Sequence, residues 1–281
     1  MAVKILTDSG ADFTRDEAAQ LGVEIVPVYL TYGAERLRDG IEIDSVTFHR
    51  RMSAGEVPDT DPASVEDYRS AYERALNAGN DVVIVTLSSV ISKSYERAAT
   101  AAADFSGKVH VVDSRGASGL ECLLAQLALE RAAAGDSAEA IAKRIDPANL
   151  KHGIFFAVPT MAALERSGRI PKAVIALGSM LNVSLLLKMN DAGAIAPAGQ
   201  SFSFDKTLDL MVEAVVRTVD RNPQARFAVA HVDAGDTANM LSGLLEKKLG
   251  HPPIQLTVRG SALTIATHLG KGAIGIYAVV S

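Results

Sequence analysis

Short apolar runs that alternate with helix-start signals are the feature that most restricts how this chain can fold. The runs lie at 3–6, 82–85 and 109–112, and each ends in a polar turn that leads into a helical segment. The first of these segments opens with Thr14 and Glu17, which can form a capping box. Strands separated by helices predict βαβ units and a mainly parallel sheet.

Further segments extend this alternation along the chain. Residues 23–30 predict one strand, helices are expected to begin near Ser45 and Ser64, and Ser118 is expected to cap a long helix that ends at Gly135. In the second half we expect strands near 153–157, 185–189, 227–231, 254–258 and 274–280, and helices near 160–167, 171–181, 205–220 and 236–249. The fold predicted is α/β: an N-terminal parallel-sheet domain, 1–151, packed on a second mixed α/β domain, 152–281.

Composition narrows the class of protein. The 281 residues carry 28 Lys and Arg against 33 Asp and Glu, a net charge of −5, which argues against a general nucleic-acid binder. The one cysteine, Cys122, excludes an intramolecular disulfide and a cysteine-based zinc or iron–sulfur cluster. Because no two histidines lie within five positions of each other, the sequence also lacks helical metal-ligand spacing. We therefore expect no metal and no cofactor.

Membrane and export signals are also weak. The longest stretch without Asp, Glu, Lys or Arg, 173–187, is too short and too polar to span a bilayer. The N-terminus reaches Asp8 before an apolar signal segment forms. We expect a cytoplasmic protein with no integral membrane segment.

The sequence carries neither a dinucleotide-binding loop nor a nucleophile elbow, two common signatures of enzymes. Residues 270–275 read G-K-G-A-I-G, but a dinucleotide site needs a following helix and an acid about 20 residues further on. The glycines fit a tight turn before the last strand better. No G-x-S-x-G nucleophile elbow is present.

Polar residues follow three of the predicted strands. Ser9, the pair Ser88 and Ser89, and Ser114 each lie two to four residues after the end of an apolar run. In a parallel sheet these ends lie on one edge, where ligands bind. Serine is also a common turn and cap residue, so each position alone favours the structural interpretation. Together they predict a polar pocket without indicating a reaction.

Several segments, read in order, resemble one family. Residues 8–12 read D-S-G-A-D, 60–64 T-D-P-A-S, 87–95 L-S-S-V-I-S-K-S-Y, 113–118 D-S-R-G-A-S, 168–170 G-R-I, 178–182 G-S-M-L-N, and 268–272 H-L-G-K-G. These are similar to the D-S-x-x-D, T-S-Q-P-S, I-S-S-x-L-S-G-T-Y, D-S-R-x-A-S, G-R-I, G-x-L-L-N and H-x-G-P-G segments of the DegV family of fatty-acid-binding proteins.

The resemblance implies a binding protein rather than an enzyme. A long-chain fatty acid such as palmitate is expected in a buried tunnel, with its carboxylate held by Thr60, Ser92 and His268. The resemblance also implies a role in lipid transport, or in presenting the acid to a fatty-acid kinase subunit in phospholipid metabolism. We expect a supporting pocket from Asp8, Ser9, Ser88, Ser89, Ser114 and Arg115, and a tail tunnel lined by Ile91, Leu164, Met180 and Leu181.

Four departures from the family pattern bear on this expectation. Asp61 stands where the family has serine and adds a negative charge near the expected carboxylate. Lys93 replaces a glycine and could offset that charge or lie in solvent. Residues 200–203, which include Phe202, replace a run that carries an arginine, and 183–185 read V-S-L in place of I-K-P.

Two alternative functions stay open at this point. One is a serine-type acyl hydrolase, with Ser92 or Ser114 as nucleophile, His268 as base, and Asp8 or Asp113 as its partner. The other is a regulatory partner protein that has lost ligand binding, suggested by Asp61 and Phe202.

Overall fold

The computed structural model describes residues 2–178 and 183–281. The chain divides into two compact units, Met1–Asn149 with Ala262–Thr267, and Leu150–Ser261 with His268–Ser281. Each unit contains both helices and strands, which confirms the predicted α/β class. The assignment of 1–151 and 152–281 as separate domains stays a prediction.

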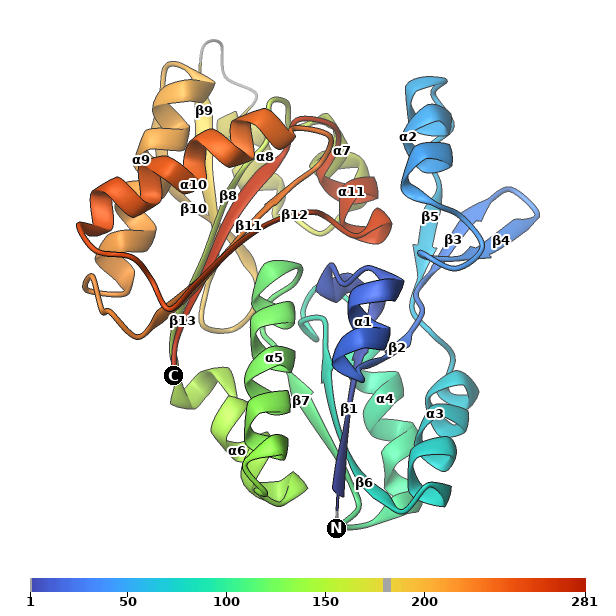
Figure 1. Cartoon of the computed structure of the whole chain (residues 1–281). Helices are drawn as coiled ribbons and strands as arrows, with labels where there is room; N and C mark the ends of the chain where they lie inside the picture. The colour runs from blue at the N-terminus through green and yellow to red at the C-terminus, as the bar shows by residue number, and fades with distance from the viewer. Residues whose placement is uncertain (1, 179–182) are drawn as a thin grey trace. The chain divides into compact units, whose positions relative to one another are not determined.

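The first unit is built on a four-stranded parallel sheet in the order β2-β1-β6-β7. Figure 1 shows α3 and α4 on one side of this sheet and α5 and α6 on the other. In chain order its strands and helices, with 3₁₀ turns written η, are β1 (Ala2–Asp8), η1 (Ser9–Ala11), α1 (Arg15–Leu21), β2 (Glu24–Val26), β3 (Tyr29–Tyr32), β4 (Glu35–Arg38), α2 (Ser45–Ser53), β5 (Asp59–Asp61), α3 (Val65–Asn77), β6 (Asn80–Thr86), α4 (Ser94–Ala102), η2 (Ala103–Phe105), β7 (Val109–Asp113), α5 (Gly119–Ala133), α6 (Ala138–Ile145) and η3 (Pro147–Asn149).

Two of the helix-start signals behave as the sequence predicts. Thr14 and Glu17 form the capping box of α1, and Gly22 ends that helix with a φ of 74°. Ser64 caps α3 with Asp67 as its reciprocal partner. Buried residues of α3 and α4 pack on β1, β2, β6 and β7 in one core, which includes Leu6, Tyr68, Tyr72, Ile84 and Ala98.

The single strand predicted at 23–30 is wrong. Two strands, β2 and β3, replace it and belong to different sheets. Pro27, between them, has no amide hydrogen to donate to a sheet. The Val28 amide donates to the Ser9 hydroxyl at 3.0 Å, and its carbonyl accepts from the Asp39 amide at 2.9 Å. The chain therefore leaves the first sheet and forms a separate three-stranded sheet, β4-β3-β5.

Ser118 does not cap α5 through its side chain. Its backbone has a φ of 57° and a ψ of −129°, and its hydroxyl donates to the buried carboxylate of Asp12. The helix after Ser92, α4, begins at Ser94, with Lys93 at the N-cap position.

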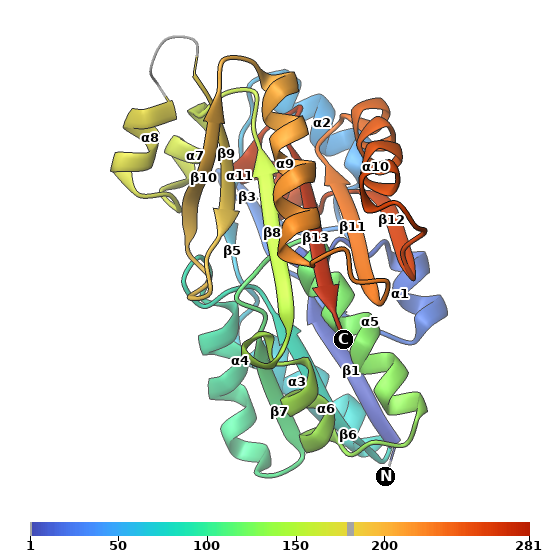
Figure 2. The ribbon, with the colours of Figure 1, turned by 90° about the vertical axis from the view of Figure 1, so that its left-hand side faces the viewer.

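The second unit contains a six-stranded mixed sheet in the order β10-β9-β8-β13-β11-β12, in which only β11 and β12 pair in parallel among the described residues. Figure 2 shows α9 lying along β8 and β13. The elements of the second unit are, in chain order, β8 (Lys151–Ala157), α7 (Ala162–Ser167), α8 (Lys172–Gly178), β9 (Ser184–Met189), β10 (Ile195–Ser201), α9 (Phe204–Thr218), β11 (Ala225–His231), α10 (Gly235–Leu249), β12 (Gln255–Gly260) and β13 (Ile274–Val280). Helix α11 (Leu263–Leu269) begins in the first unit and ends in the second.

Strand β10 has no counterpart in the sequence prediction. It contains Pro197 and Gly199, two residues that weaken strand patterns, and its register shifts between them. It is an edge strand, where both are tolerated. The predicted helix at 171–181 is observed as α8 up to Gly178, and 179–181 lie outside the described residues.

Candidate functional site

The polar residues predicted at the sheet edge do meet there. Strands β1, β6 and β7 are neighbours, so Asp8, Ser88 and Ser114 share the edge at the carboxyl ends of the strands. The Asp8 carboxylate accepts from the Gly10 amide at 2.8 Å and from the Leu87 amide at 3.0 Å. It therefore joins the turns that follow β1 and β6.

The other polar side chains at this edge form hydrogen bonds within the turn after β7, or between that turn and the one after β6. The hydroxyl oxygen of the fully buried Ser114 accepts from the Gly116 amide at 3.1 Å. Ser89 donates to Asp113 at 2.6 Å, and Asp113 also accepts from the Arg115 amide at 2.8 Å. These bonds brace the loops around the edge, which is the structural interpretation that the sequence left open.

A buried acidic pair that the sequence did not indicate lies behind this edge. Glu121 of α5 and Asp8 are both fully buried, and Thr7 donates to Glu121 at 2.7 Å. Burial raises the pKa of Asp8, and burial together with the charge of Asp8 raises the pKa of Glu121 well above its ordinary value. Glu121 is therefore the member of the pair that holds a proton most tightly. The available signal was an acid at the third position of α5, directly before the apolar run at 122–125.

Thr60 lies on β5, opposite Leu30 of β3. Successive side chains of a strand point to opposite faces, so the half-buried Thr60 faces away from Asp59 and Asp61. This arrangement separates the hydroxyl from the neighbouring carboxylate that the sequence placed beside it.

Ser92 lies two residues before α4 and is half-buried. Its Oγ accepts from the Ser94 amide at 3.1 Å and is 3.0 Å from the Ser94 hydroxyl. The hydroxyl therefore lies at the N-terminal end of a nine-residue helix, where the helix dipole favours negative charge. Lys93 is exposed.

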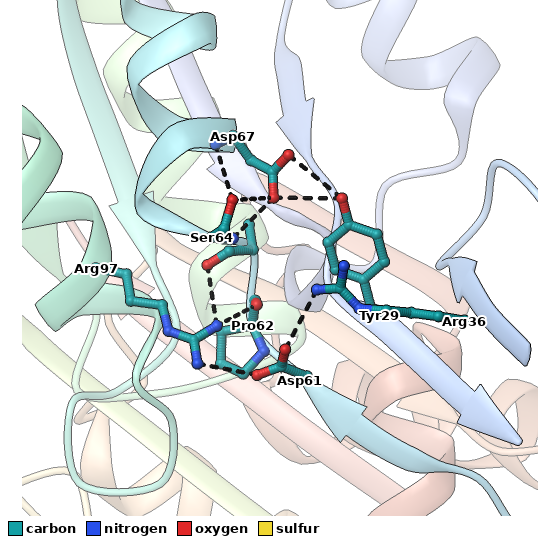
Figure 3. Close-up of polar contacts among 8 residues, drawn as sticks. Tyr29, Arg36, Asp61, Pro62, Ser64, Asp67 and Arg97 are labelled. Atoms are coloured by element: carbon teal, nitrogen blue, oxygen red, sulfur yellow. Dashed lines mark hydrogen bonds and ion pairs between the residues drawn. The ribbon is translucent and has the colours of Figure 1, made fainter. Parts of the chain in front are cut away.

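The negative charge of Asp61 is paired on both sides. Its carboxylate is 3.2 Å from Arg36 of β4 and 3.0 Å from Arg97 of α4 (Figure 3). Two guanidinium groups therefore face the negative charge that Asp61 adds at this position.

His268 lies near the end of α11 and belongs to the second unit. Burial, with Arg169 and Arg166 as nearby positive charges, lowers the pKa of His268 to about 4. The imidazole is neutral at pH 7, so it can offer a carboxylate one N–H donor but no positive charge.

Two buried aspartates of the first unit hold the start of α11. The Asp12 carboxylate accepts from the Ala262 amide at 2.8 Å. Asp39 accepts from the Thr264 amide at 3.0 Å and from its hydroxyl at 2.7 Å. These bonds explain why Ala262–Thr267 groups with the first unit.

The predicted tail residues fall in different parts of the chain. Ile91 of the first unit is half-buried, and Leu164 of the second unit is buried in α7. Met180 and Leu181 lie outside the described residues. The tail tunnel stays a prediction.

Comparison with known proteins identifies the family. Residues 2–281 match the model of the DegV family, whose description is "uncharacterised protein". The chain belongs to the DegV family. A DegV domain-containing protein of Mycobacterium tuberculosis is 31% identical over 279 residues, which cover 98% of this chain and 96% of that protein.

Two further DegV relatives carry a functional name. A fatty acid-binding protein of Thermotoga maritima is 28% identical, over 98% of this chain and 96% of the relative. The solved structure of a DegV family protein from Thermus thermophilus, described by its fatty acid binding, is 28% identical and superposes with a TM-score of 0.89 over 100% of both chains. DegV relatives are thus named for fatty-acid binding and not for an enzymatic reaction.

Two further structural features of this DegV chain concern a membrane-spanning helix and the hydrolase alternative. Among the described residues, no helix is long and apolar enough to cross a membrane. Ser114, one nucleophile of the hydrolase alternative, has 0% exposure, so its hydroxyl is not presented to a substrate.

Proposed function

We propose that this chain binds a long-chain fatty acid, such as palmitate, with its carboxylate at Thr60 and Ser92. The observation that carries the proposal is the full-length likeness to the fatty-acid-binding proteins of Thermotoga maritima and Thermus thermophilus. The two hydroxyls suit the ligand, because a buried carboxylate needs hydrogen-bond partners. The Arg97–Asp61 ion pair also joins β5, which carries Thr60, to α4, which begins two residues after Ser92.

The carboxylate head and the acyl tail of the fatty acid contribute differently to the free energy of binding. A tail of about 16 carbons gains about 12 kcal/mol at about 0.8 kcal/mol per buried CH₂, and association costs at least about 4 kcal/mol. Each hydrogen bond to the charged head contributes about 1.5–3 kcal/mol. The tail therefore dominates affinity, and the hydroxyls fix the orientation of the acid. This division explains how a head-group site works without the arginine that the family often has near 200–203.

Three parts of the proposal extend beyond the head-group site. His268 would supply a further donor to the carboxylate, and Ile91, Leu164, Met180 and Leu181 would line the tail. The bound acid would be transported, or presented to a fatty-acid kinase subunit that transfers the γ-phosphoryl group of ATP to the carboxylate. A cytoplasmic location belongs to the same proposal.

Mass spectrometry of the purified full chain tests the central claim. We expect a co-purified mass equal to that of a C16 or C18 fatty acid, and binding of added palmitate after delipidation. A chain that carries no fatty acid and does not bind added palmitate contradicts the proposal and favours the regulatory alternative.

A further inference from the structure

Arg97 joins the strand that carries Thr60 to the helix that follows Ser92. Its Nη2 is 3.0 Å from the Asp61 carboxylate, and its Nη1 donates to the Pro62 carbonyl at 2.5 Å and to the Ala63 carbonyl at 3.3 Å (Figure 3). One guanidinium of α4 thus holds both the side chain and the backbone of the segment directly after Thr60. Arginine suits this task because its planar fork donates in several directions at once.

A second set of contacts holds the other side of Asp61. Arg36 pairs with Asp61 at 3.2 Å, and its guanidinium carbon lies 3.4 Å from the centre of the Tyr29 ring. The Tyr29 hydroxyl donates to Asp67 at 3.3 Å, and Asp67 belongs to the capping box of α3. Figure 3 shows these side chains in a continuous series that runs from α3 through β3 and β4 to Asp61.

The two arginines and two aspartates of this series balance in charge, because Asp67 at one end offsets the excess of positive charge around Asp61 at the other. One carboxylate, Asp61, faces the two guanidinium groups of Arg36 and Arg97, so the three side chains sum to one positive charge. Thr60 points to the opposite face of β5 from Asp61.

The contacts of Arg97 fix the positions of the groups they join more than they stabilise the fold. The side chains of Asp61 and Arg97 are 45% and 28% exposed, and ion pairs at such exposure add little to stability by themselves. A hydrogen bond to a ligand, in contrast, weakens steeply when donor and acceptor lose alignment. We propose that Arg97, through Asp61 and the carbonyls after it, is a positioning residue that fixes Thr60 relative to Ser92 for carboxylate binding. This inference rests on the proposed function.

The test compares palmitate with methyl palmitate, which keeps the tail but lacks the charged head. In the full delipidated chain, R97Q lowers palmitate affinity about tenfold, comparable to losing one bond to a charged group. It leaves methyl palmitate affinity unchanged, which also shows that the variant is folded. R97K gives the same loss, because lysine keeps the charge but lacks the fork.

The matched control is R69Q on α3, where Arg69 also bridges two carboxylates, those of Glu66 and Asp104. R69Q keeps wild-type affinity for both ligands.

A double variant separates positioning from general structural damage. If Arg97 acts through Thr60, R97Q has no further effect on palmitate affinity in a T60V background. Additive losses in the double variant, or wild-type palmitate affinity in R97Q or R97K, overturn the proposal while the head-group site stands. Equal affinity of the wild type for palmitate and its ester is a different result, because it removes the head-group site itself.

Discussion

Replacing Asp39 by asparagine should change how stability depends on pH. Asp39 is 4% exposed and accepts from Ser9 and from both the amide and the hydroxyl of Thr264. Burial outweighs these donors and raises the pKa of Asp39 from 3.8 to about 6. The folded state thus holds a proton more tightly than the unfolded state, so stability is highest below about pH 4 for this group and falls as the pH rises to about 6. At about 1.4 kcal/mol per pKa unit, the fall amounts to about 3 kcal/mol.

Asparagine removes this dependence and can keep an oxygen acceptor for Thr264. Urea unfolding of the wild type and Asp39→Asn across pH 4 to 7.5 measures the difference. We expect the wild type to lose about 3 kcal/mol relative to the variant over this range, with no further change above about pH 7. The control is Asp44→Asn, because the Thr47 amide lowers the pKa of Asp44 and the dependence has the opposite sign. Parallel curves for the wild type and Asp39→Asn would refute the reasoning.

Three further predictions concern the ligand and the second unit. Thr60→Val and Ser92→Ala should each weaken palmitate binding by about 1–3 kcal/mol in calorimetry and leave the fold intact, because each removes one donor to an anion; unchanged affinity in both would contradict the head-group site. The pKa of His268 is lowered to about 4 without ligand. It should rise when palmitate binds if the carboxylate contacts the ring, so binding should take up a proton at pH values just above about 4. An NMR titration of His268 that is identical with and without palmitate removes the histidine from the site. Gly272→Ala should lower the thermal midpoint, because φ is +84° and an added Cβ would lie 2.7 Å from Pro159; Gly243→Ala, where nothing lies within 4 Å, is the control and should not lower it.

Local signals determined a large part of the first unit. The strand at 82–85 and the capping box of Thr14 depend on residues within a few positions of one another, and both are observed. The polar ends of β1, β6 and β7 followed from the same reasoning, because parallel neighbours place their carboxyl ends on one edge. The ordered motifs then pointed to the DegV family and to Thr60 and Ser92 as candidates.

Tertiary structure decided what those candidates contact. Arg97 and Pro62 are 35 positions apart, and Asp39 and Thr264 are 225 apart, so no local pattern contains either pair. The charge of Asp61 is evident from the sequence, but its two arginine partners are not. The apolar run at 23–30 is equally evident, but the Val28 contacts that divide it between two sheets are not. Local propensity specifies where strands and helices form, whereas the pairing of charges and buried polar groups depends on which distant segments the fold brings within hydrogen-bond distance.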